Sequence, residues 1–269
     1  MNMARAIVLL FILISCHTGK LKVINDLPNG LKEVSAIEKT VDSDLLWLIE
    51  DSGNANTLYA INIKGEIVKD IEIDNAVNID WEDLTSDKSG NIYIGDFGNN
   101  AHKRKVFSIY KVIDPMHSNK NEQALTINFK LPKDIYKQDF EAFFIYNDHF
   151  YIFNKDHKET MLFKVPNKIG THTAKIITRH SFAGKHNAIT SADISNDGKT
   201  VVLLNSDKLW KLSGFEGDDF FSGKIEKEKF EHKSQKEGIC FNDENSFYIN
   251  DERKGHSGGN LYYFDLKFE

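Results

Sequence analysis

Beyond Lys20 the chain is a succession of short apolar runs, rich in Val, Ile, Phe and Tyr, separated by Asn, Asp, Gly and Lys. Short runs bounded by turn residues are typical of β-strands, and no stretch repeats apolar residues at helical spacing over three turns. The pattern therefore predicts an all-β chain built from hairpins. Five runs end in a residue with a side-chain oxygen, namely Leu46–Glu50, Ile92–Asp96, Phe150–Asn154, Val201–Asn205 and Phe247–Asp251.

These five strands mark a repeat. Their last residues are separated by 46, 58, 51 and 46 positions, which is the length expected of a four-stranded propeller blade. A third strand is predicted in each repeat, at residues 58–61, 108–111, 162–165, 209–212 and 261–264. A fourth strand is predicted in the first four repeats, at residues 67–73, 125–131, 175–181 and 224–230.

The fifth repeat has no fourth strand, because the sequence ends soon after Phe264. The run Leu21–Ile24 precedes the first repeat and supplies the missing strand. We therefore predict a single five-bladed β-propeller of antiparallel blades, in which the N-terminal strand completes the last blade and leaves no free edge at the join. A six-bladed alternative would need one more repeat than we find in the sequence.

The first residues follow a different pattern. Arg5 precedes a continuous apolar run, Ala6–Ile14, which is typical of a secretory signal and too short to span a bilayer. Leu13–Cys16 resembles a bacterial lipobox, in which the cysteine is lipidated and becomes the N-terminus; an ordinary signal, cleaved or retained, is the alternative. The predicted parts of the chain are a signal at 1–15, a lipidated tether at 16–19 and the propeller domain at 20–269.

The residues after Cys16 predict the location of the protein in the cell. An acidic stretch after the lipidated cysteine can direct a lipoprotein to the cell surface, whereas the tether here is His17–Lys20. We therefore expect a lipid-anchored protein of the cell envelope that faces the periplasm, from the outer membrane of a Gram-negative bacterium. Its predicted partners are the membrane, through the lipid on Cys16, and an unidentified envelope protein or small ligand.

Composition narrows the functional classes. The 269 residues carry a net charge of −6, and Lys and Arg do not form a clustered basic face, which argues against nucleic acid as a partner. The two cysteines, Cys16 and Cys240, cannot form a disulfide framework. Cys240 stands in an apolar run and is expected to be a small buried hydrophobe. We expect a monomer.

Aligning the repeats brings acidic residues together. In a propeller the first strand of each blade lines the central channel, and alternate residues face it. The first apolar residues after the acidic stretches serve as reference positions: Ile37, Leu84, Phe143, Ile194 and Ile239. Positions two and four before each reference should face the channel, together with the end of the second strand, and Asp193 should face away. The predicted metal ligands are Glu33, Asp80, Glu82, Asp96, Asp139, Glu141, Glu237 and Asp251, supported by Glu50, Asn154 and Asn205.

Carboxylates around one axis repel each other. Two unit charges about 4 Å apart cost roughly 4 kcal/mol at an effective dielectric of about 20, so either some carboxyls are protonated or a cation lies among them. Oxygen-only ligation favours calcium over zinc, which prefers imidazole and thiolate. Two alternatives stay open: the side chains cap turns, or they line a water-filled channel that holds no specific ion. Blade four carries Thr190 and Ala192 where others carry acids, which breaks the symmetry of the ring.

Short motifs carry a family resemblance. Glu33–Ile37 and Glu237–Ile239 resemble the SdiA-regulated family of bacterial five-bladed propellers, which is distantly similar to NHL-repeat and phytase-like propellers. Asp80–Asp83 with Gly95–Asn100 resembles a motif of uncharacterised secreted bacterial propellers. The resemblance covers essentially residues 20–269 and implies a propeller with calcium bound on its axis.

Calcium on the axis is compatible with two functions. The first is a binding or scaffold module of the envelope. The second is a calcium-dependent esterase, phosphatase or lactonase, in which the metal polarises a substrate oxygen and Arg104, within the basic triplet Lys103–Lys105, contacts an anion. Gly255–Gly259 matches the G-x-S-x-G pattern of serine hydrolases, but a strand-like run and no histidine follow it, so we do not expect that chemistry.

Overall fold

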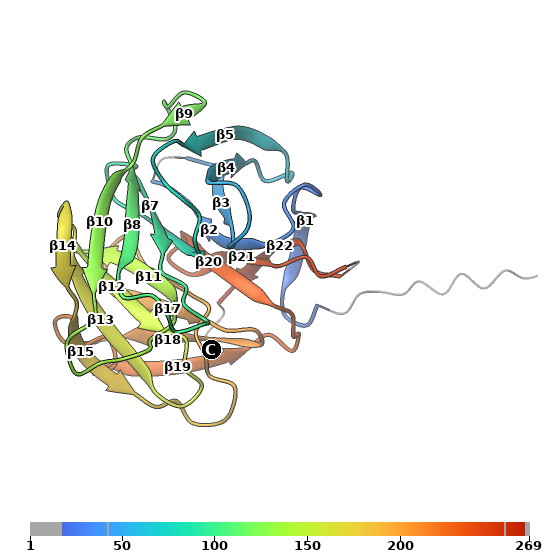
Figure 1. Cartoon of the computed structure of the whole chain (residues 1–269). Helices are drawn as coiled ribbons and strands as arrows, with labels where there is room; N and C mark the ends of the chain where they lie inside the picture. The colour runs from blue at the N-terminus through green and yellow to red at the C-terminus, as the bar shows by residue number, and fades with distance from the viewer. Residues whose placement is uncertain (1–17, 42, 256, 267–269) are drawn as a thin grey trace, which may run out of the picture.

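The computed structural model describes residues 18–41, 43–255 and 257–266, and this part of the chain contains strands and no helix. Five sheets stand around a central axis as the blades of a propeller (Figure 1). The innermost strands contact one another around the ring, the last returning to the first, which confirms the five-bladed prediction. In blade order they are β2 (Val34–Glu38), β6 (Trp81–Ser86), β11 (Phe140–Tyr146), β16 (Ser191–Ile194) and β20 (Lys236–Asp243).

In blades 1 to 4 the four main strands follow chain order from the axis outward and pair antiparallel. The predicted second, third and fourth strands lie within two residues of the observed bounds. Blade 1 continues with β3 (Leu46–Glu50), β4 (Thr57–Ile61) and β5 (Ile67–Ile73), blade 2 with β7 (Ile92–Asp96), β8 (Phe107–Val112) and β10 (Leu125–Lys130), blade 3 with β12 (His149–Asn154), β13 (Thr160–Pro166) and β15 (Lys175–His180), blade 4 with β17 (Thr200–Leu204), β18 (Lys208–Ser213) and β19 (Lys224–Lys229), and blade 5 with β21 (Ser246–Asp251) and β22 (Asn260–Asp265).

The N-terminal strand closes the ring. β1 (Lys22–Asp26) pairs antiparallel with β22, with Lys22 opposite Tyr263, and becomes the outermost strand of blade 5. The predicted closure is therefore confirmed. One sheet then contains strands from both ends of the chain, so the two ends hold each other in place and neither leaves an open edge at the join.

Two blades have a strand that the sequence did not predict. β9 (Asn121–Glu122) pairs parallel with β5 on the outside of blade 1, and β14 (Gly170–Thr173) pairs parallel with β10 on the outside of blade 2. Each comes from a loop of the following blade that reaches back. These short parallel strands cover outer edges that four-stranded blades would leave unpaired.

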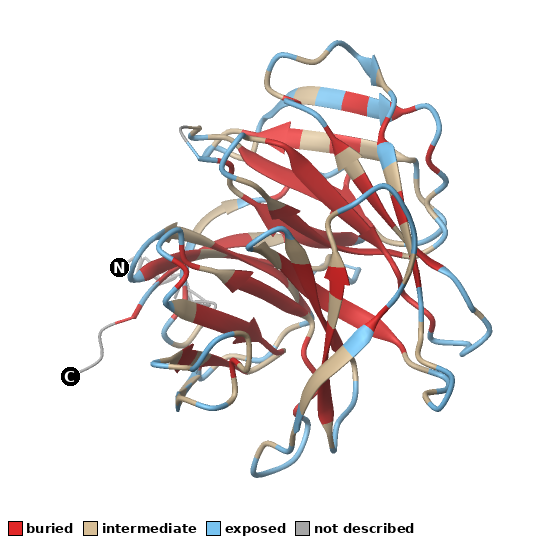
Figure 2. Ribbon diagram, turned by 90° about the vertical axis from the view of Figure 1, so that its left-hand side faces the viewer, coloured by how far each residue is buried: buried red, intermediate tan, exposed pale blue. Residues whose placement is uncertain are grey.

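The second strands are apolar throughout because both of their faces are buried. In β3, Trp47 and Ile49 pack into the core between blades 1 and 2, whereas Leu46 and Leu48 pack into the core between blades 1 and 5. One such core fills each of the five interfaces between blades. Figure 2 shows the result, with buried residues in the inner strands and exposed residues in the loops.

The chain is attached to the propeller from its first described residues. The backbone N–H of Lys20 donates to the carbonyl oxygen of Phe230 at 2.7 Å, and Leu21 is buried. The predicted signal and the predicted lipidation site, Cys16, lie outside the described residues. Within the described residues, no helix is long and apolar enough to cross a membrane.

Candidate metal centre

A β-bulge interrupts the innermost strand of four blades at the same place. The extra residue is Ser35 in blade 1 and a glutamate in the other three, namely Glu82, Glu141 and Glu237. A bulge leaves one residue unpaired and changes the direction of its side chain. We call the end of the channel where the innermost strands begin the acidic end; its carboxyl groups are those of Asp51, Asp80, Glu82, Asp139, Glu141 and Glu237.

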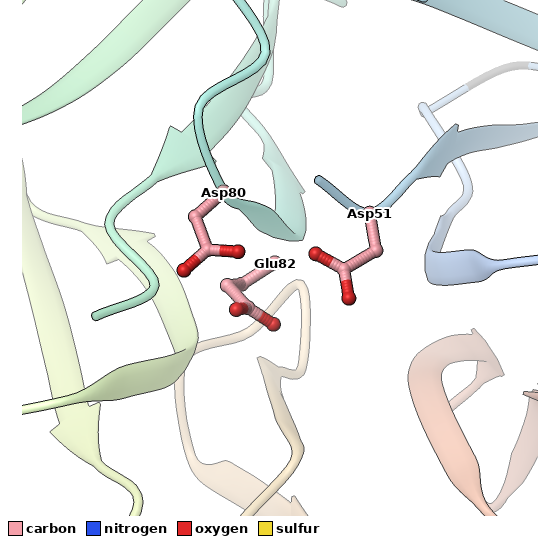
Figure 3. Close-up of side chains that lie close together, drawn as sticks. All are labelled: Asp51, Asp80 and Glu82. Carbon is pink, nitrogen blue, oxygen red and sulfur yellow. The ribbon is translucent and has the colours of Figure 1, made fainter. Parts of the chain in front are cut away.

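Three carboxylates meet at the acidic end. One oxygen from each of Asp51, Asp80 and Glu82 lies within 4.8 Å of the other two. Figure 3 shows these side chains gathered together, Asp51 after β3 of blade 1 and the other two at the start of β6 in blade 2. Two predicted ligands, Asp80 and Glu82, are in this cluster. Sequence reasoning missed Asp51 because the aligned strand ended one residue earlier, at Glu50.

Asn78 holds the two blades in this arrangement. Its Nδ2 donates to the carbonyl oxygens of Glu50 at 2.8 Å and Asp51 at 2.9 Å, both in blade 1. Its Oδ1 accepts the backbone N–H of Trp81 at 3.1 Å, a side-chain turn that starts β6. A single amide therefore fixes the backbone that carries Asp51 beside the turn that carries Asp80.

Gly98 leaves the space that two of the carboxyl groups occupy. Its N–H donates to the carbonyl oxygen of Asp80 at 3.2 Å, and a Cβ at this position would collide with Glu82 Oε1 and with the Asp80 carboxyl group. The loop after β7 therefore approaches the cluster as closely as a glycine backbone permits.

Gly98→Ala is expected to lower the free energy of unfolding by about 1–3 kcal/mol, the usual cost of overpacking, and to displace the cluster. Urea denaturation measures the effect. Gly30 is the matched control, because a Cβ there meets nothing within 4 Å, so Gly30→Ala should stay within about 0.5 kcal/mol of the wild type. Equal effects of the two substitutions would show that the space beside the cluster is not filled.

Burial and mutual repulsion raise the pKa values of the cluster. Burial raises the pKa of Glu82 well above its usual range, and the charges of Asp51 and Asp80 raise it further. Burial is also the main cause that raises the pKa of Asp51 and of Asp80. A pair of unit charges 4.8 Å apart costs about 3.5 kcal/mol at an effective dielectric of about 20. The three groups therefore need protons or a cation to lie this close.

Lys155 brings one cation to the acidic end. Its ammonium group forms an ion pair with Glu141, and its charge lowers the pKa of Glu82, Asp139 and Glu237. Burial nevertheless raises the pKa of Glu237 to about 7. Sequence reasoning missed this lysine because it follows the last residue of its strand. One ammonium group does not balance the carboxyl groups of the acidic end.

The side chains that end the second strands fix loops. Asp251 uses both carboxylate oxygens: Oδ1 accepts the backbone N–H of Asn260, and Oδ2 accepts the Tyr262 hydroxyl at 2.7 Å. The structure does not bring Asp251 into the cluster. The turn-capping alternative describes all five side chains. Each accepts a backbone N–H: Asp96 from Asp80 at 3.0 Å, Glu50 from Lys32 at 2.9 Å, Asn154 from Met161 at 2.7 Å, Asn205 from Asp207 at 3.3 Å and Asp251 from Asn260 at 2.8 Å.

Arg104 acts through Asp96. Its guanidinium donates to Asp96 Oδ1 at 2.9 Å and to the carbonyl oxygens of Gly98 and Asp96. Since Asp96 Oδ1 also accepts the N–H of Asp80, the arginine orients the carboxylate that holds a cluster residue in place. Its predicted contact with an anion stays a prediction.

Like Asp251, the other predicted ligands lie outside the cluster, namely Glu33, Asp96, Asp139, Glu141 and Glu237. Asp139 Oδ1 accepts the backbone N–H of Asn99 at 2.6 Å, which ties blade 3 to the loop after β7. Glu33 is exposed, and its Oε2 accepts Asn54 Nδ2 at 2.8 Å. The cluster of three is therefore smaller than the ring that the sequence predicted, and blades 1 and 2 supply it.

Asp83 crosses the middle of the channel. Its fully buried carboxylate accepts the N–H of Leu84 and Phe143 and the Ser191 hydroxyl, each at 3.0 Å, and the N–H of Ala192 at 3.4 Å. These donors belong to blades 2, 3 and 4. Simple alternation after Glu82 would turn Asp83 away from the axis, but the bulge at Glu82 shifts the alternation by one residue.

The prediction that Asp193 faces away from the channel is wrong. Its Oδ2 accepts the N–H of Phe241 in the neighbouring innermost strand at 2.8 Å. Strand pairing sets Ser191, and not Asp193, level with Asp83, so the reference residue of blade four was aligned two positions too far along. Blade 4 has no bulge within β16, and Thr190 stands directly before Ser191 where blades 2, 3 and 5 have a glutamate, so this blade contributes no carboxylate there.

A comparison of the sequence with models of known protein families finds no match, and a search of curated proteins finds none. The resemblance to the SdiA-regulated family therefore stays a prediction from short motifs. The five-bladed architecture stands on the pairing of the strands themselves.

Proposed function

We propose that the acidic end is a calcium site, and that the protein is a binding or scaffold module of the cell envelope, anchored by a lipid on Cys16. The observation that carries this proposal is the cluster of Asp51, Asp80 and Glu82, whose carboxylate oxygens lie within 4.8 Å of one another. Burial makes the ionised cluster unfavourable without a cation. A propeller presents such a site at the mouth of its channel, where a partner can reach it.

The donor set suits calcium. Calcium takes about 6–8 oxygen ligands at roughly 2.3–2.6 Å, so opposite ligands in its shell are about 4.6–5.2 Å apart. Carboxylate oxygens within 4.8 Å of one another fit inside such a shell. Zinc would prefer imidazole or thiolate ligands, and the cluster contains neither. Asp51, Asp80 and Glu82 would hold the ion and leave positions for water or for an oxygen of a partner.

Calcium is expected to stabilise the protein more at about pH 7.5 than at about pH 5. A carboxyl group with a raised folded-state pKa contributes stability that is complete below its unfolded pKa and is lost as pH rises through the folded pKa. For Glu237 this window runs from the ordinary value of 4.5 to about 7, and Asp51, Asp80 and Glu82 act in the same direction. In chelator the melting temperature should therefore fall as the pH rises through this window.

Thermal melts in chelator, in calcium and in magnesium test the calcium site and the pH dependence of its effect on stability. Calcium binds ionised carboxylates, so it should restore the melting temperature at about pH 7.5 and change it little at about pH 5. Magnesium is the control, because it demands a tighter octahedral shell. Identical melting in calcium and in chelator at neutral pH would refute the calcium site.

The start of the propeller supports a close attachment. Lys20 is hydrogen-bonded to Phe230, and the Thr18 hydroxyl donates to the carbonyl oxygen of Leu21 at 2.7 Å. A lipid on Cys16 would therefore leave almost no free chain between the bilayer and the folded domain. A propeller held this way would keep the same side toward the membrane.

Cys16→Ala is expected to move the protein from the membrane fraction to the soluble fraction of cells, because the lipid would be its anchor. Fractionation followed by immunoblotting measures the change. Cys240→Ala is the control, since Cys240 is a buried core residue and its loss should not alter the fraction. Unchanged membrane association of Cys16→Ala would rule out lipidation as the anchor.

The calcium-dependent hydrolase is the alternative function. It shares the proposed metal site and differs in needing a substrate, and it rests on resemblance of fold, which does not establish chemistry. Phosphatase and lactonase assays in calcium, with Glu82→Gln as the inactive control, would separate an enzyme from a binding module.

A further inference from the structure

A cavity lies at the opposite end of the channel from the acidic end, where the innermost strands finish; we call it the pocket end. Its volume is about 500 Å³, and residues from all five blades line it. Cavities that hold small molecules have volumes of about 300–1,000 Å³. The bonds of Asp83 to blades 3 and 4 cross the channel between the two ends. The pocket end is therefore distinct from the acidic end.

Two buried carboxyl groups line this cavity. Glu38 is only 4 % exposed; its Oε1 accepts the Ser86 hydroxyl at 2.6 Å, and its buried Oε2 has no hydrogen-bond partner. Asp193, from blade 4, is also buried and accepts the backbone N–H groups of Phe241 and Ile194. A buried oxygen without a partner is costly in a folded protein, and it marks the place where a donor belongs.

Burial and the charge of Asp193 favour a cation beside Glu38. Burial is the main cause that raises the pKa of Glu38 well above its usual range, and the charge of Asp193 raises it further. Burial raises the pKa of Asp193 to about 7. A positive charge of a ligand beside these two groups would favour their ionised forms.

Three other charged groups in the wall of the cavity, Asp87, Asp197 and Lys39, have hydrogen-bond partners. Asp87 accepts the Tyr93 hydroxyl at 2.8 Å, and Asp197 accepts the Ser195 hydroxyl at 2.7 Å. Lys39 donates its ammonium group to Asn242 Oδ1 at 3.2 Å. Lys88 is exposed in the wall, and neither lysine forms an ion pair with Glu38 or Asp193 within the described part of the chain.

The donor set at the pocket end does not suit a metal ion. Three of the four carboxyl oxygens of Glu38 and Asp193 already accept a hydrogen bond. Among the described residues, three potential metal ligands gather at the acidic end and not here. An ammonium group needs fewer acceptors than a calcium shell, and it donates directly to an oxygen such as Glu38 Oε2.

We propose that the pocket end binds a small organic molecule through an ammonium group, which Glu38 Oε2 receives with Asp193 beside it. Tyr146 and Phe241 line the same cavity, and aromatic faces attract organic cations. Ile145 and Ile194 offer apolar surface to the carbon chain of the ligand. The proposal is independent of the calcium site, because the two ends share no residue.

Isothermal titration of the full chain with 1,4-diaminobutane and 1,4-butanediol tests this inference. One molecule of diamine per chain should bind with a Kd of about 1 mM or tighter, and the neutral diol of the same length should not bind. Glu38→Gln keeps the shape of the side chain and should weaken diamine binding about tenfold or more. Glu82→Gln, at the acidic end, should leave it unchanged.

Equal binding of diamine and diol, equal loss in Glu38→Gln and Glu82→Gln, or no binding of the diamine by the wild type would each overturn the inference. If Glu38→Gln does not fold, Asp193→Asn replaces it and should also weaken the diamine. Calcium should neither compete with the diamine nor enhance its binding. The experiment therefore tests the pocket end independently of the calcium site.

Discussion

Asp83→Ala is expected to lower the free energy of unfolding by about 3–5 kcal/mol, and the melting temperature by roughly 10 °C. The carboxylate accepts four hydrogen bonds in a place where water does not replace it. Alanine would leave the N–H groups of Phe143, Leu84 and Ala192 buried without partners, and each orphaned donor costs about 1–3 kcal/mol. Urea denaturation monitored by the tryptophan signal measures the change.

Removing a single hydrogen-bond partner of Asp83 should destabilise the protein less than removing Asp83 itself. Ser191→Ala removes one of the four donors and should cost about 1 kcal/mol. Asp70→Ala is the surface control, since Asp70 is exposed, and should stay within about 0.5 kcal/mol of the wild type. If Asp83→Ala were no more harmful than Asp70→Ala, the carboxylate would not join blades 2, 3 and 4 as we infer.

Glu82→Gln should abolish the stabilisation of the protein by calcium. The amide keeps the shape of the side chain and removes a buried charge that repels Asp51 and Asp80. In chelator at neutral pH the variant should therefore melt at a higher temperature than the wild type. In calcium at a hundredfold excess over Kd the wild type should gain about 2.7 kcal/mol, or roughly 5–10 °C, and the variant should gain almost nothing.

Glu33→Gln is the matched control for this experiment. Glu33 is an acid of the same kind, predicted from the sequence as a ligand, but it is exposed and lies outside the cluster. Its variant should keep the whole calcium response. A variant of Glu33 that lost the response while Glu82→Gln kept it would place the ion elsewhere.

The fold was predictable because the blades impose a simple pattern on the sequence. A strand between two blades is apolar on both faces, as Leu46–Ile49 shows, and its polar end recurs once per blade. The strands β9 and β14 were not predictable, because two to four polar residues pairing on an outer edge leave no apolar signal.

The candidate site was only partly predictable, and β-bulges explain why. Alternation assigns side chains to faces one residue at a time, and a bulge shifts the assignment by one. The alignment found Asp80 and Glu82 but assigned Asp83 no role, although the side chains of Glu82 and Asp83 both lie in the channel. It also stopped one residue before Asp51 and Lys155, which extend past the strand ends.

For a related reason Glu38 was overlooked and Asp193 was assigned to the wrong face. Both lie at the far ends of innermost strands, and the acids that drew attention lie at the near ends. The two acids hold the same position in blades 1 and 4, and the other three blades have Thr85, Phe144 and Cys240 there. A single acid in an apolar strand gives no repeat signal, and closure of the ring brings the two together.

Equilibrium calcium titration of the chelator-treated protein tests the central claim most directly. At about pH 7.5 the wild type should bind one calcium ion per chain, and Glu82→Gln should bind none under the same conditions. Wild-type protein that takes up no calcium, or a Glu82→Gln variant that binds it as the wild type does, would contradict the assignment of a calcium site to Asp51, Asp80 and Glu82.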